Sequence, residues 1–478
     1  MSATIHESIR VAYETIPYVG LPFHETHPSR LRAVARLLGI APPVRETISV
    51  LEIGSGDGSN LLPIAAAYPH GRFVGVDLSA LLTARARAAA EGMGVRNVTL
   101  VEADLRELPH SLGQFDIVMG HGVYSWVPPD VRDALLRLVA TRLVPGGVAY
   151  LNYNLLPGGW LRRIGWDAMQ FHVRGVEDPA ARVARAREFI ALMVEHWKTQ
   201  PGSGAALAAN FAREAARDDS GIYHDDLAVQ NEPVYYATFV RHARMHGLEV
   251  LGDVDPGTRS PGSAGPALRE RLATRDPVAR EQMLDFVHLR QMRQSLLVRA
   301  GTSRLPARDT DGLHFAASMP YMQHRFAGGL APDAVGDLLA EAFPASLPSA
   351  AIVSALRARG LAEADAHAKL REAWSIGLAD PYVDALAIAA RPSLRPRASA
   401  VSRWQAARGS IVTNLRHTGA RLADDCARSV LVVCDGTRTA TEIAAAVRPA
   451  IPSDEARDPQ AAVARRLGQL ASAALLEA

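Results

Sequence analysis

Apolar and polar positions alternate in blocks along the first third of the chain. Short apolar runs, each long enough for one strand, cover residues 48–53, 72–77, 98–101, 115–119 and 148–153. Segments with helical periodicity fill the intervals at 60–67, 80–91 and 130–143. Strands that alternate with helices in this way are typical of a parallel sheet with crossover connections. The pattern therefore predicts an α/β protein with a Rossmann-like, doubly wound core.

The pattern changes after the fifth of these runs. Residues 160–217 show the periodicity of long helices rich in Ala and Arg, and a later amphipathic helix ends at Gly247. Apolar runs follow at 248–251 and 296–298. Because a helix that ends at Gly and leads at once into a short apolar run suits an α/β sheet, we predict that these runs are its sixth and seventh strands. Residues 161–231 are then a helical insertion over the carboxyl edge of the sheet.

The rest of the chain predicts smaller units. Residues 255–267 form a loop rich in Gly, Pro and Ser, 302–320 have room for one or two strands, and 327–390 are helical. From Ser399 onward the order is helix, short apolar run, helix, helix, which suits a small winged-helix-like module. We therefore divide the chain into five parts. The N-terminal segment with the core covers residues 1–160, a helical insertion covers 161–231, and a segment that completes the sheet covers 232–303. A mainly helical middle domain covers 304–395, and a winged-helix-like domain covers 396–478.

Composition and charge exclude several classes of protein. Of the 478 residues, 48% are hydrophobic and 21% charged, and these globular proportions exclude a disordered or fibrous chain. Basic residues number 52 and acidic residues 50, so the net charge of +2 creates no field that attracts nucleic acid or an anionic membrane. The cysteines, Cys426 and Cys434, are too few for a disulfide framework or a four-ligand zinc site.

No segment has the pattern of a targeting signal or a membrane span. The N-terminal sequence MSATIHESIR lacks a basic stretch followed by an apolar core, and no run of about 18 apolar residues occurs. We therefore expect a soluble, cytoplasmic protein of bacterial type, without membrane insertion.

Acidic residues accompany a glycine loop that follows the first predicted strand. The segment Glu52-Ile53-Gly54-Ser55-Gly56-Asp57-Gly58 has alternating glycines, which allow a tight turn and the close approach of a ligand. Asp77 ends the second strand, where a carboxylate accepts hydrogen bonds from both hydroxyls of a ribose. Asp104 follows the third strand, where a carboxylate can take the exocyclic amine of an adenine. The loop contains no Lys or Arg, so it disfavours a diphosphate and favours a ligand with a cationic amino group.

These segments resemble the motifs of class I S-adenosylmethionine-dependent methyltransferases. Residues 50–58 resemble the first motif of that family and 75–79 the second, and 103–105 and 143–147 fit the same set. The resemblance implies a seven-stranded class I methyltransferase sheet and S-adenosylmethionine as the cofactor. It also implies the residues that bind the cofactor, which are Tyr18, Glu52, Gly54, Ser55, Gly56, Asp57, Asn60, Asp77, Leu78, Ala103, Asp104, Leu105 and His121.

A narrower resemblance extends over most of the chain. This chain resembles bacterial methyltransferases with a methyltransferase regulatory domain at its residues 18–28, 120–128, 152–158, 224–236 and 282–297. Residues 412–417 and 431–438 are similar to the C-terminal winged-helix module of rickettsial protein-lysine methyltransferases. Familiar members of that group methylate lysines of an outer-membrane protein, so the resemblance implies a protein or peptide acceptor. One departure is an extra glycine, Gly159, before Trp160, which would reshape a substrate loop.

Aromatic residues follow the fourth and fifth predicted strands. Tyr124 and Trp126 come directly after the fourth strand, and Tyr153 and Asn154 end the fifth. Because ligands bind at the carboxyl ends of the strands in open α/β sheets, we predict that Tyr124, Trp126 and Tyr153 converge on the transferred methyl group. Tyr153 and Tyr124 are our candidate catalytic residues, with Tyr153 as an optional general base. Trp126, Asn154 and Trp160 are our candidates for contact with the substrate.

Other functions fit parts of the sequence. A small-molecule or natural-product N- or O-methyltransferase would use the same cofactor, with a closed pocket under the insertion in place of an open groove. A DNA-binding regulator would use the winged-helix-like module, but acidic residues offset the arginines there and leave no basic stripe, so we expect no nucleic-acid partner. The segment His24-Glu25-Thr26-His27 lacks the i, i+4 spacing of a metal-binding helix and precedes Pro28, so we expect no metal site. The acceptor, the number of methyl groups added and the oligomeric state, for which a homodimer is one option, stay open.

Overall fold

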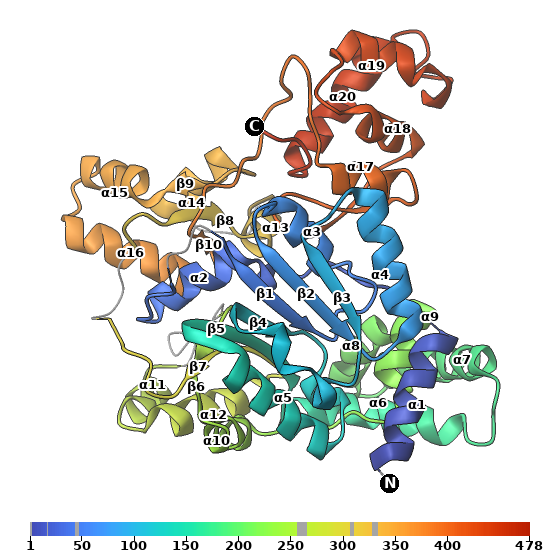
Figure 1. Cartoon of the computed structure of the whole chain (residues 1–478), viewed down its shortest axis with the longest axis vertical. Helices are drawn as coiled ribbons and strands as arrows, with labels where there is room; N and C mark the ends of the chain where they lie inside the picture. The colour runs from blue at the N-terminus through green and yellow to red at the C-terminus, as the bar shows by residue number, and fades with distance from the viewer. Residues whose placement is uncertain (1, 17, 44–46, 256–264, 306–309, 327–332) are drawn as a thin grey trace.

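A sheet of seven strands forms the centre of the molecule in the computed structural model (Figure 1). The structure describes residues 2–16, 18–43, 47–255, 265–305, 310–326 and 333–478. The strand order in the sheet is β3-β2-β1-β4-β5-β7-β6. The strands are β1 (Ser49–Ile53), β2 (Arg72–Asp77), β3 (Val98–Glu102), β4 (Phe115–Gly120), β5 (Leu143–Asn154), β6 (Leu248–Asp253) and β7 (Met292–Arg299).

The last two strands complete the sheet from a distant part of the chain. Strands β1 to β5 are parallel, and β7 runs antiparallel between β5 and β6. Tyr150 of β5 pairs with Leu296 of β7. On its other side, β7 pairs with β6, which is the edge strand of the sheet. Helices α11 (Pro266–Ala273) and α12 (Pro277–His288) connect β6 to β7. The pairing confirms the predicted seven-stranded α/β sheet, including its sixth and seventh strands.

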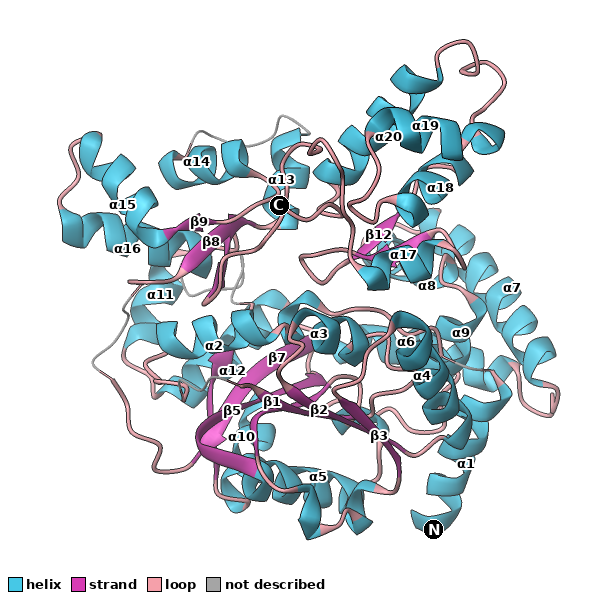
Figure 2. Ribbon diagram, turned by 45° about the horizontal axis from the view of Figure 1, so that its top comes forward, coloured by secondary structure: helices cyan, strands magenta, loops and turns pink. Residues whose placement is uncertain are grey.

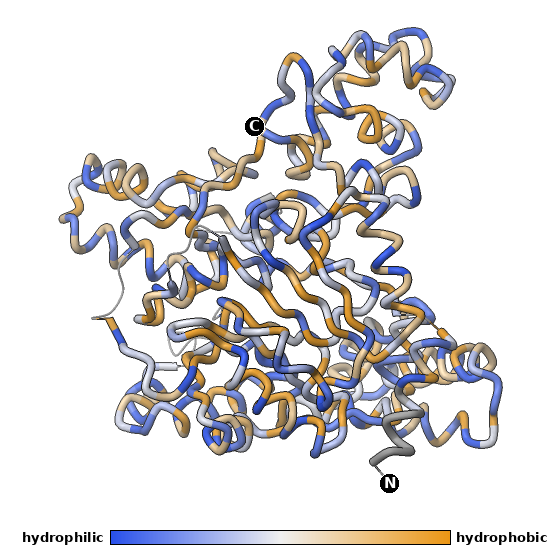
Figure 3. The backbone as a smooth tube through the Cα atoms, in the orientation of Figure 1, coloured by the Kyte–Doolittle hydropathy of each residue, from blue (hydrophilic) through white to orange (hydrophobic). Residues whose placement is uncertain are grey.

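Helices cover both faces of the sheet (Figure 2). Helices α5 (Pro129–Arg142) and α10 (Tyr236–Met245) pack on one face, and α2 (Pro28–Leu37), α3 (Leu61–Ala67) and α4 (Ala80–Met93) pack on the other. Successive side chains of a strand point to opposite faces, so Leu51 and Val50 of β1 belong to two different buried clusters. Because both faces are covered, the parallel strands are apolar along most of their length, as Figure 3 shows.

The segment predicted as an insertion is helical and follows β5. Its elements are α6 (Gly159–His172), α7 (Pro179–Lys198), α8 (Ser203–Ala215), α9 (Asp219–Gly221) and a π-helical turn at Ile222–Asp226. Met169, Ile190 and Phe211 are among the buried residues of a small core that these helices share. Helix α1 (Ser2–Thr15) lies beside them (Figure 1), and Tyr13 of α1 stacks on His224 with ring centroids 4.4 Å apart.

A second, three-stranded sheet organises the middle region. Its strands β10 (Ala379–Tyr382), β8 (His314–Ala317) and β9 (Leu347–Pro348) pair antiparallel in that order. The helices of this region are α13 (Met319–Phe326), α14 (Ala334–Ala342), α15 (Ser349–Ala358) and α16 (Glu363–Ser375). The region is mainly helical, as predicted, but β9 and β10 lie within the stretch that was expected to be helical. The sequence pattern did not indicate them because strands this short contain too few residues to show a strand periodicity. Most of the loop predicted at 255–267 and residues 327–332 of the predicted helical stretch lie outside the described residues.

The C-terminal residues form a module with a buried core of its own. Its elements are α17 (Ala400–Ala406), the hairpin of β11 (Ile411–Thr413) and β12 (Gly419–Arg421), α18 (Asp425–Val433), α19 (Ala440–Ala446) and α20 (Pro459–Ser472). Trp404 of α17 packs on Gly92 of α4, where an added Cβ would lie 2.2 Å from the indole nitrogen. Glycine at this helical position therefore allows the module to pack directly on the core.

Candidate active site

The glycine loop between β1 and α3 depends on positive backbone angles. Gly54, Gly56 and Gly58 have φ values of 72°, 54° and 79°, which other residues rarely adopt. A Cβ on Gly54 would also lie 2.7 Å from a methyl group of Val123. The backbone N–H of Gly54 donates to the carbonyl of Val76 at the end of β2, which holds the turn in place. The loop is therefore tight and lets a ligand approach its backbone closely.

A cavity of about 220 Å³ lies at the carboxyl edge of the parallel strands, next to this loop. Every residue predicted to bind the cofactor lines it, from Tyr18 in the N-terminal segment to His121 after β4. Trp126, predicted to contact the substrate, lines it as well. Sequence reasoning missed Tyr13 and Phe23, which also line the cavity. Tyr13 lies on an N-terminal helix without a motif, so no local pattern indicates it, whereas Phe23 falls within a segment that resembles known methyltransferases.

Glu52 is a buried carboxylate with one unused oxygen on the cavity wall. Its Oε1 accepts a hydrogen bond of 2.7 Å from the side-chain amide of Asn60, which precedes α3. Its Oε2 is buried and has no hydrogen-bond partner among the described residues. Burial raises the pKa of Glu52 to about 8. A buried acceptor without a partner costs free energy, so this position suits a ligand that donates hydrogen bonds, above all an ammonium group.

Asp77 holds the glycine loop and faces the cavity at the end of β2. Its two carboxylate oxygens accept hydrogen bonds of 2.8 and 2.9 Å from the backbone N–H groups of Gly56 and Ser79. Burial raises the pKa of Asp77 above its usual range. A carboxylate has about four lone-pair positions, so Asp77 can accept further hydrogen bonds from two neighbouring hydroxyls. Its position fits the ribose role predicted from the sequence.

Asp104 also lines the cavity, but it already has a partner. Its carboxylate forms an ion pair with the guanidinium of Arg106 at 2.6 Å and accepts a hydrogen bond from the backbone N–H of the same residue. An adenine amine at this position would share the carboxylate with that guanidinium. The role of Asp104 in adenine binding therefore stays a prediction.

An aromatic pair forms the cavity wall after β4. His121 stacks on Phe23 with ring centroids 3.6 Å apart. Its ring nitrogens each lie 3.1 Å from a polar partner, the Tyr150 hydroxyl on one side and the Asn152 amide on the other. Burial lowers the pKa of His121 to about 4. The ring is therefore fixed and neutral at pH 7, so it adds no positive charge to the cavity.

Tyr124 and Tyr153 do not line the cavity, contrary to the predicted convergence of three aromatic residues. Tyr124 bonds to His242 of α10 at 2.8 Å, and Tyr153 bonds to Ser295 of β7 at 3.0 Å. Both rings lie in the buried cluster on the face that α10 covers. Because side chains on β5 alternate, Tyr153 shares this face with Leu151 and points away from the cavity. This corrects the placement on which their catalytic roles depended.

The remaining substrate candidates lie outside the cavity, near the start of α6. Asn154 donates a hydrogen bond of 2.9 Å to Asn231 and lines a second, smaller pocket together with Arg162 and Trp166. Trp160 is 56% exposed. Both residues are available to a partner that approaches along α6, and their contact with a substrate stays a prediction.

Known families match three separate segments of the chain. The matching models describe a methyltransferase domain at residues 50–147, a predicted methyltransferase regulatory domain at 218–299 and a PKMT C-terminal winged helix domain at 395–472. An uncharacterized protein of Rickettsia prowazekii is 31% identical over 252 residues, which cover 52% of this chain and 99% of that protein. The chain belongs to the S-adenosylmethionine-dependent methyltransferases.

Two further matches place the methyltransferase among its relatives. A second uncharacterized protein of Rickettsia prowazekii is 35% identical over 289 residues, 60% of this chain and 52% of that protein, so the methyltransferase spans about half the length of this relative. PKMT2 from Rickettsia typhi superposes with a TM-score of 0.83 at 23% identity and covers 96% of this chain and 100% of its own. PKMT2 in complex with AdoHcy gives a TM-score of 0.84 at 22% identity. These likenesses show the fold over nearly the whole chain.

The cofactor of this family, S-adenosylmethionine, fits the chemistry of the cavity. It carries an ammonium and a sulfonium and no phosphate. The cavity is lined by the acidic residues Glu52, Asp57 and Asp77, and Glu52 has an oxygen without a partner. A phosphate-bearing nucleotide would be repelled by the carboxylates of Asp57 and Asp77.

Binding of the cofactor or its demethylated product is expected to be strongest near pH 8. Below the Glu52 pKa of about 8, the carboxyl group must lose a proton before it binds an ammonium, so affinity falls by up to about tenfold per pH unit. At a pH above the pKa of its α-amino group the ligand loses its own proton, so affinity falls again. Calorimetry with S-adenosylhomocysteine in buffers of different ionisation enthalpy should therefore show proton release at pH 7 and proton uptake at pH 9.

A Glu52→Gln variant is the control for this pH dependence. It cannot ionise at this position, so it should show no proton release at pH 7 and should keep only the decline at alkaline pH. A wild-type affinity that stays constant between pH 6 and 8 would contradict the raised pKa of Glu52.

Proposed function

We propose that the methyltransferase transfers the methyl group of S-adenosylmethionine to lysine side chains of a protein. The observation that carries this proposal is the likeness in fold to PKMT2, a protein-lysine methyltransferase, which extends over the core, the helical segment and the C-terminal module together. The match of residues 395–472 to a PKMT winged helix domain supports the same class of acceptor.

The predicted cofactor residues have distinct roles in this proposal. Glu52 binds the ammonium through its unused Oε2, and Asp77 accepts hydrogen bonds from the ribose hydroxyls. Asp104 and Arg106 together face the adenine edge. When bound, S-adenosylmethionine supplies a methyl group attached to a positively charged sulfur. A neutral amine can attack the methyl carbon, and the sulfur leaves as a thioether.

The protein aligns a neutral lysine amine and does not need to supply a separate acid or base. Alignment alone can contribute about 7–11 kcal/mol to lowering the barrier of such a displacement. Desolvation lowers the pKa of a lysine, so an apolar wall also favours its neutral form. Trp126 lines the cavity and is our candidate for this wall. Tyr124 and Tyr153 lie in the hydrophobic core, and this proposal gives them no role in the methyl transfer.

The state of the cysteines supports a proposal for the compartment in which the methyltransferase acts. No described helix combines the length and the apolar character needed to cross a membrane. Cys426 and Cys434 are buried and do not form a disulfide, which suits a reducing compartment. We infer that the methyltransferase acts in the cytoplasm, as the sequence led us to expect.

Labelled cofactor tests the class of acceptor. The purified methyltransferase, with methyl-labelled S-adenosylmethionine and an extract of the source organism, should label proteins, and mass spectrometry should locate the methyl groups on lysine. A Gly54→Val variant is the control, since its side chain would collide with Val123 and should abolish labelling. Label found only in small molecules would overturn the protein acceptor, and failure of the wild type to bind S-adenosylhomocysteine would overturn methyl transfer itself.

A further inference from the structure

The C-terminal module contacts the residue that holds Glu52 in the cofactor cavity. His417 lies at the turn between β11 and β12, with a φ of 59°, and is 3% exposed. Its Nε2 is 2.8 Å from Oδ1 of Asn60. Asn60 lines the cavity and donates to Oε1 of Glu52 at 2.7 Å. A continuous path of two hydrogen bonds therefore runs from the module to the carboxylate.

The direction of each hydrogen bond in this path is fixed by its neighbours. Oδ1 of Asn60 also accepts from the backbone N–H of Phe23 at 2.9 Å. The hydroxyl of Thr26 lies 3.0 Å from the same oxygen, but its single proton points to the Phe23 carbonyl at 2.7 Å. A backbone N–H can only donate, so the oxygen of the amide must face it and the NH₂ group must face Glu52. His417 consequently carries its proton on Nε2 and donates to Asn60. Burial lowers the pKa of His417 well below its usual value, which keeps this ring neutral.

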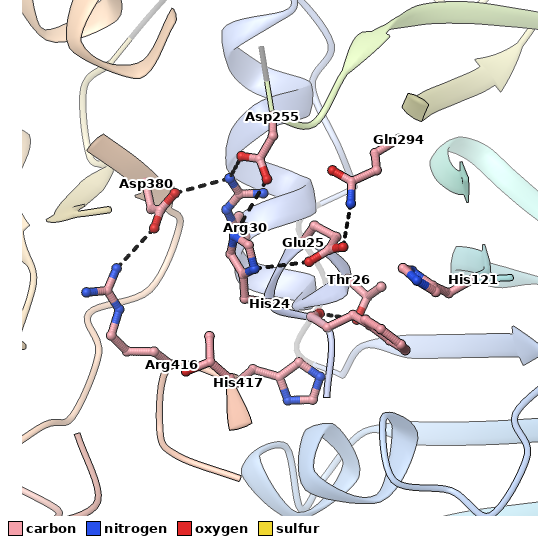
Figure 4. A network of polar contacts seen from close by, with 12 residues as sticks. His24, Glu25, Thr26, Arg30, His121, Asp255, Gln294, Asp380, Arg416 and His417 are labelled. Carbon is pink, nitrogen blue, oxygen red and sulfur yellow. Dashed lines mark hydrogen bonds and ion pairs between the residues drawn. The ribbon is translucent and has the colours of Figure 1, made fainter. Parts of the chain in front are cut away.

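The turn that carries His417 is anchored by a buried ion network (Figure 4). Arg416 donates to Asp380 of β10 at 3.0 Å, and the same carboxylate accepts from Arg30 of α2 at 3.1 Å. The side chains of Arg416 and Arg30 are 2% and 1% exposed. Arg30 contacts Asp255 as well. Because breaking such a buried pair is costly, the position of His417 relative to Asn60 is set by elements from three parts of the chain.

We propose that His417 is a positioning residue of the cofactor site, which orients Asn60, and through it Glu52, for binding of the cofactor ammonium. The proposal rests on the proposed assignment of Glu52 to that ammonium. It gives the C-terminal module a role in cofactor binding in addition to any role in acceptor binding. By linkage, a cofactor that binds best when the module is docked must also stabilise the docked module.

Two substitutions of His417 separate the hydrogen bond from mere packing. His417→Phe keeps a planar ring without a donor, and His417→Gln keeps a donor at a similar reach. Calorimetry with S-adenosylhomocysteine should give a dissociation constant about fivefold higher for the Phe variant, as expected for one lost hydrogen bond, and a value near that of the wild type for the Gln variant. The matched control is His367→Phe, which removes a histidine hydrogen bond to Thr310 in the middle region and should leave binding unchanged.

The outcomes distinguish this proposal from the proposed function. Absence of binding to the wild type would overturn the proposed function. A folded Phe variant that binds as tightly as the wild type, or a folded Gln variant that is as weak as the Phe variant, would overturn the role of His417. If the Phe variant does not fold, hydrogen exchange of the wild type decides: S-adenosylhomocysteine should slow exchange in the hairpin at residues 411–421, and no change there overturns the proposal.

Discussion

Asp77→Ala is expected to weaken the binding of S-adenosylhomocysteine by about a hundredfold or more. The substitution removes the proposed acceptors for both ribose hydroxyls, and hydrogen bonds to a charged group contribute about 1.5–3 kcal/mol each. It also removes the carboxylate that accepts from the backbone of Gly56 and Ser79. The loop therefore loses both a ligand contact and its own support. Isothermal titration calorimetry with the purified variant measures the loss.

The control for this prediction is an aspartate away from the cavity. Asp133 of α5 contacts His242 of α10 and His246, the residue directly after α10, and does not line the cavity. Asp133→Ala should therefore bind S-adenosylhomocysteine as the wild type does. An Asp77→Ala variant that binds within threefold of the wild type, or a wild type that binds NAD more tightly, would count against the assigned cofactor site.

Arg293→Met is expected to destabilise the core by about 3–5 kcal/mol, the usual cost of breaking a buried ion network. Arg293 lies on β7, is 1% exposed at its side chain, and packs over the ring of Tyr236. Its guanidinium donates hydrogen bonds of 2.9 Å to three carboxylates, those of Asp253, Glu281 and Asp285. Removal of the arginine would leave these carboxylates without their closest cation. Urea unfolding followed by circular dichroism should show the lower midpoint.

The loss of stability should depend on pH in a defined direction. Burial raises the pKa of Asp285 to about 6 even with Arg293 in place. Without the arginine, protonation of the carboxylates at pH 5 relieves part of the penalty, so the variant should be closer to the wild type at pH 5 than at pH 8. Arg163→Leu is the control, because Arg163 forms an exposed pair with Asp167 and such pairs contribute about 0–1 kcal/mol. Equal midpoints for the Arg293 variant and the wild type at pH 8 would refute the prediction.

Much of the core and of the cofactor cavity could be predicted from the sequence because the evidence is local. The period of apolar residues gives strands and helices, and in a parallel sheet the residues after the strands meet at one edge. Glu52 lies one residue before the end of β1, Asp77 ends β2 and Asp104 follows β3, so their proximity in space follows from their places in the sequence. The evidence for the return of the chain to the sheet was equally local, since Gly247 ends a helix directly before β6.

The sequence by itself therefore determined the sheet, the glycine loop and the acidic character of the cavity, whereas only the tertiary structure decided which side chains complete and support it. Tyr153 ends a strand at the correct edge, yet packing of β5 against α10 turns it into the core. His417 is 357 residues from Asn60 along the chain, and their contact depends on how the module packs on α4 and β10. No periodicity or motif records such a contact, because its geometry is set jointly by many weak interactions between segments that are remote in sequence.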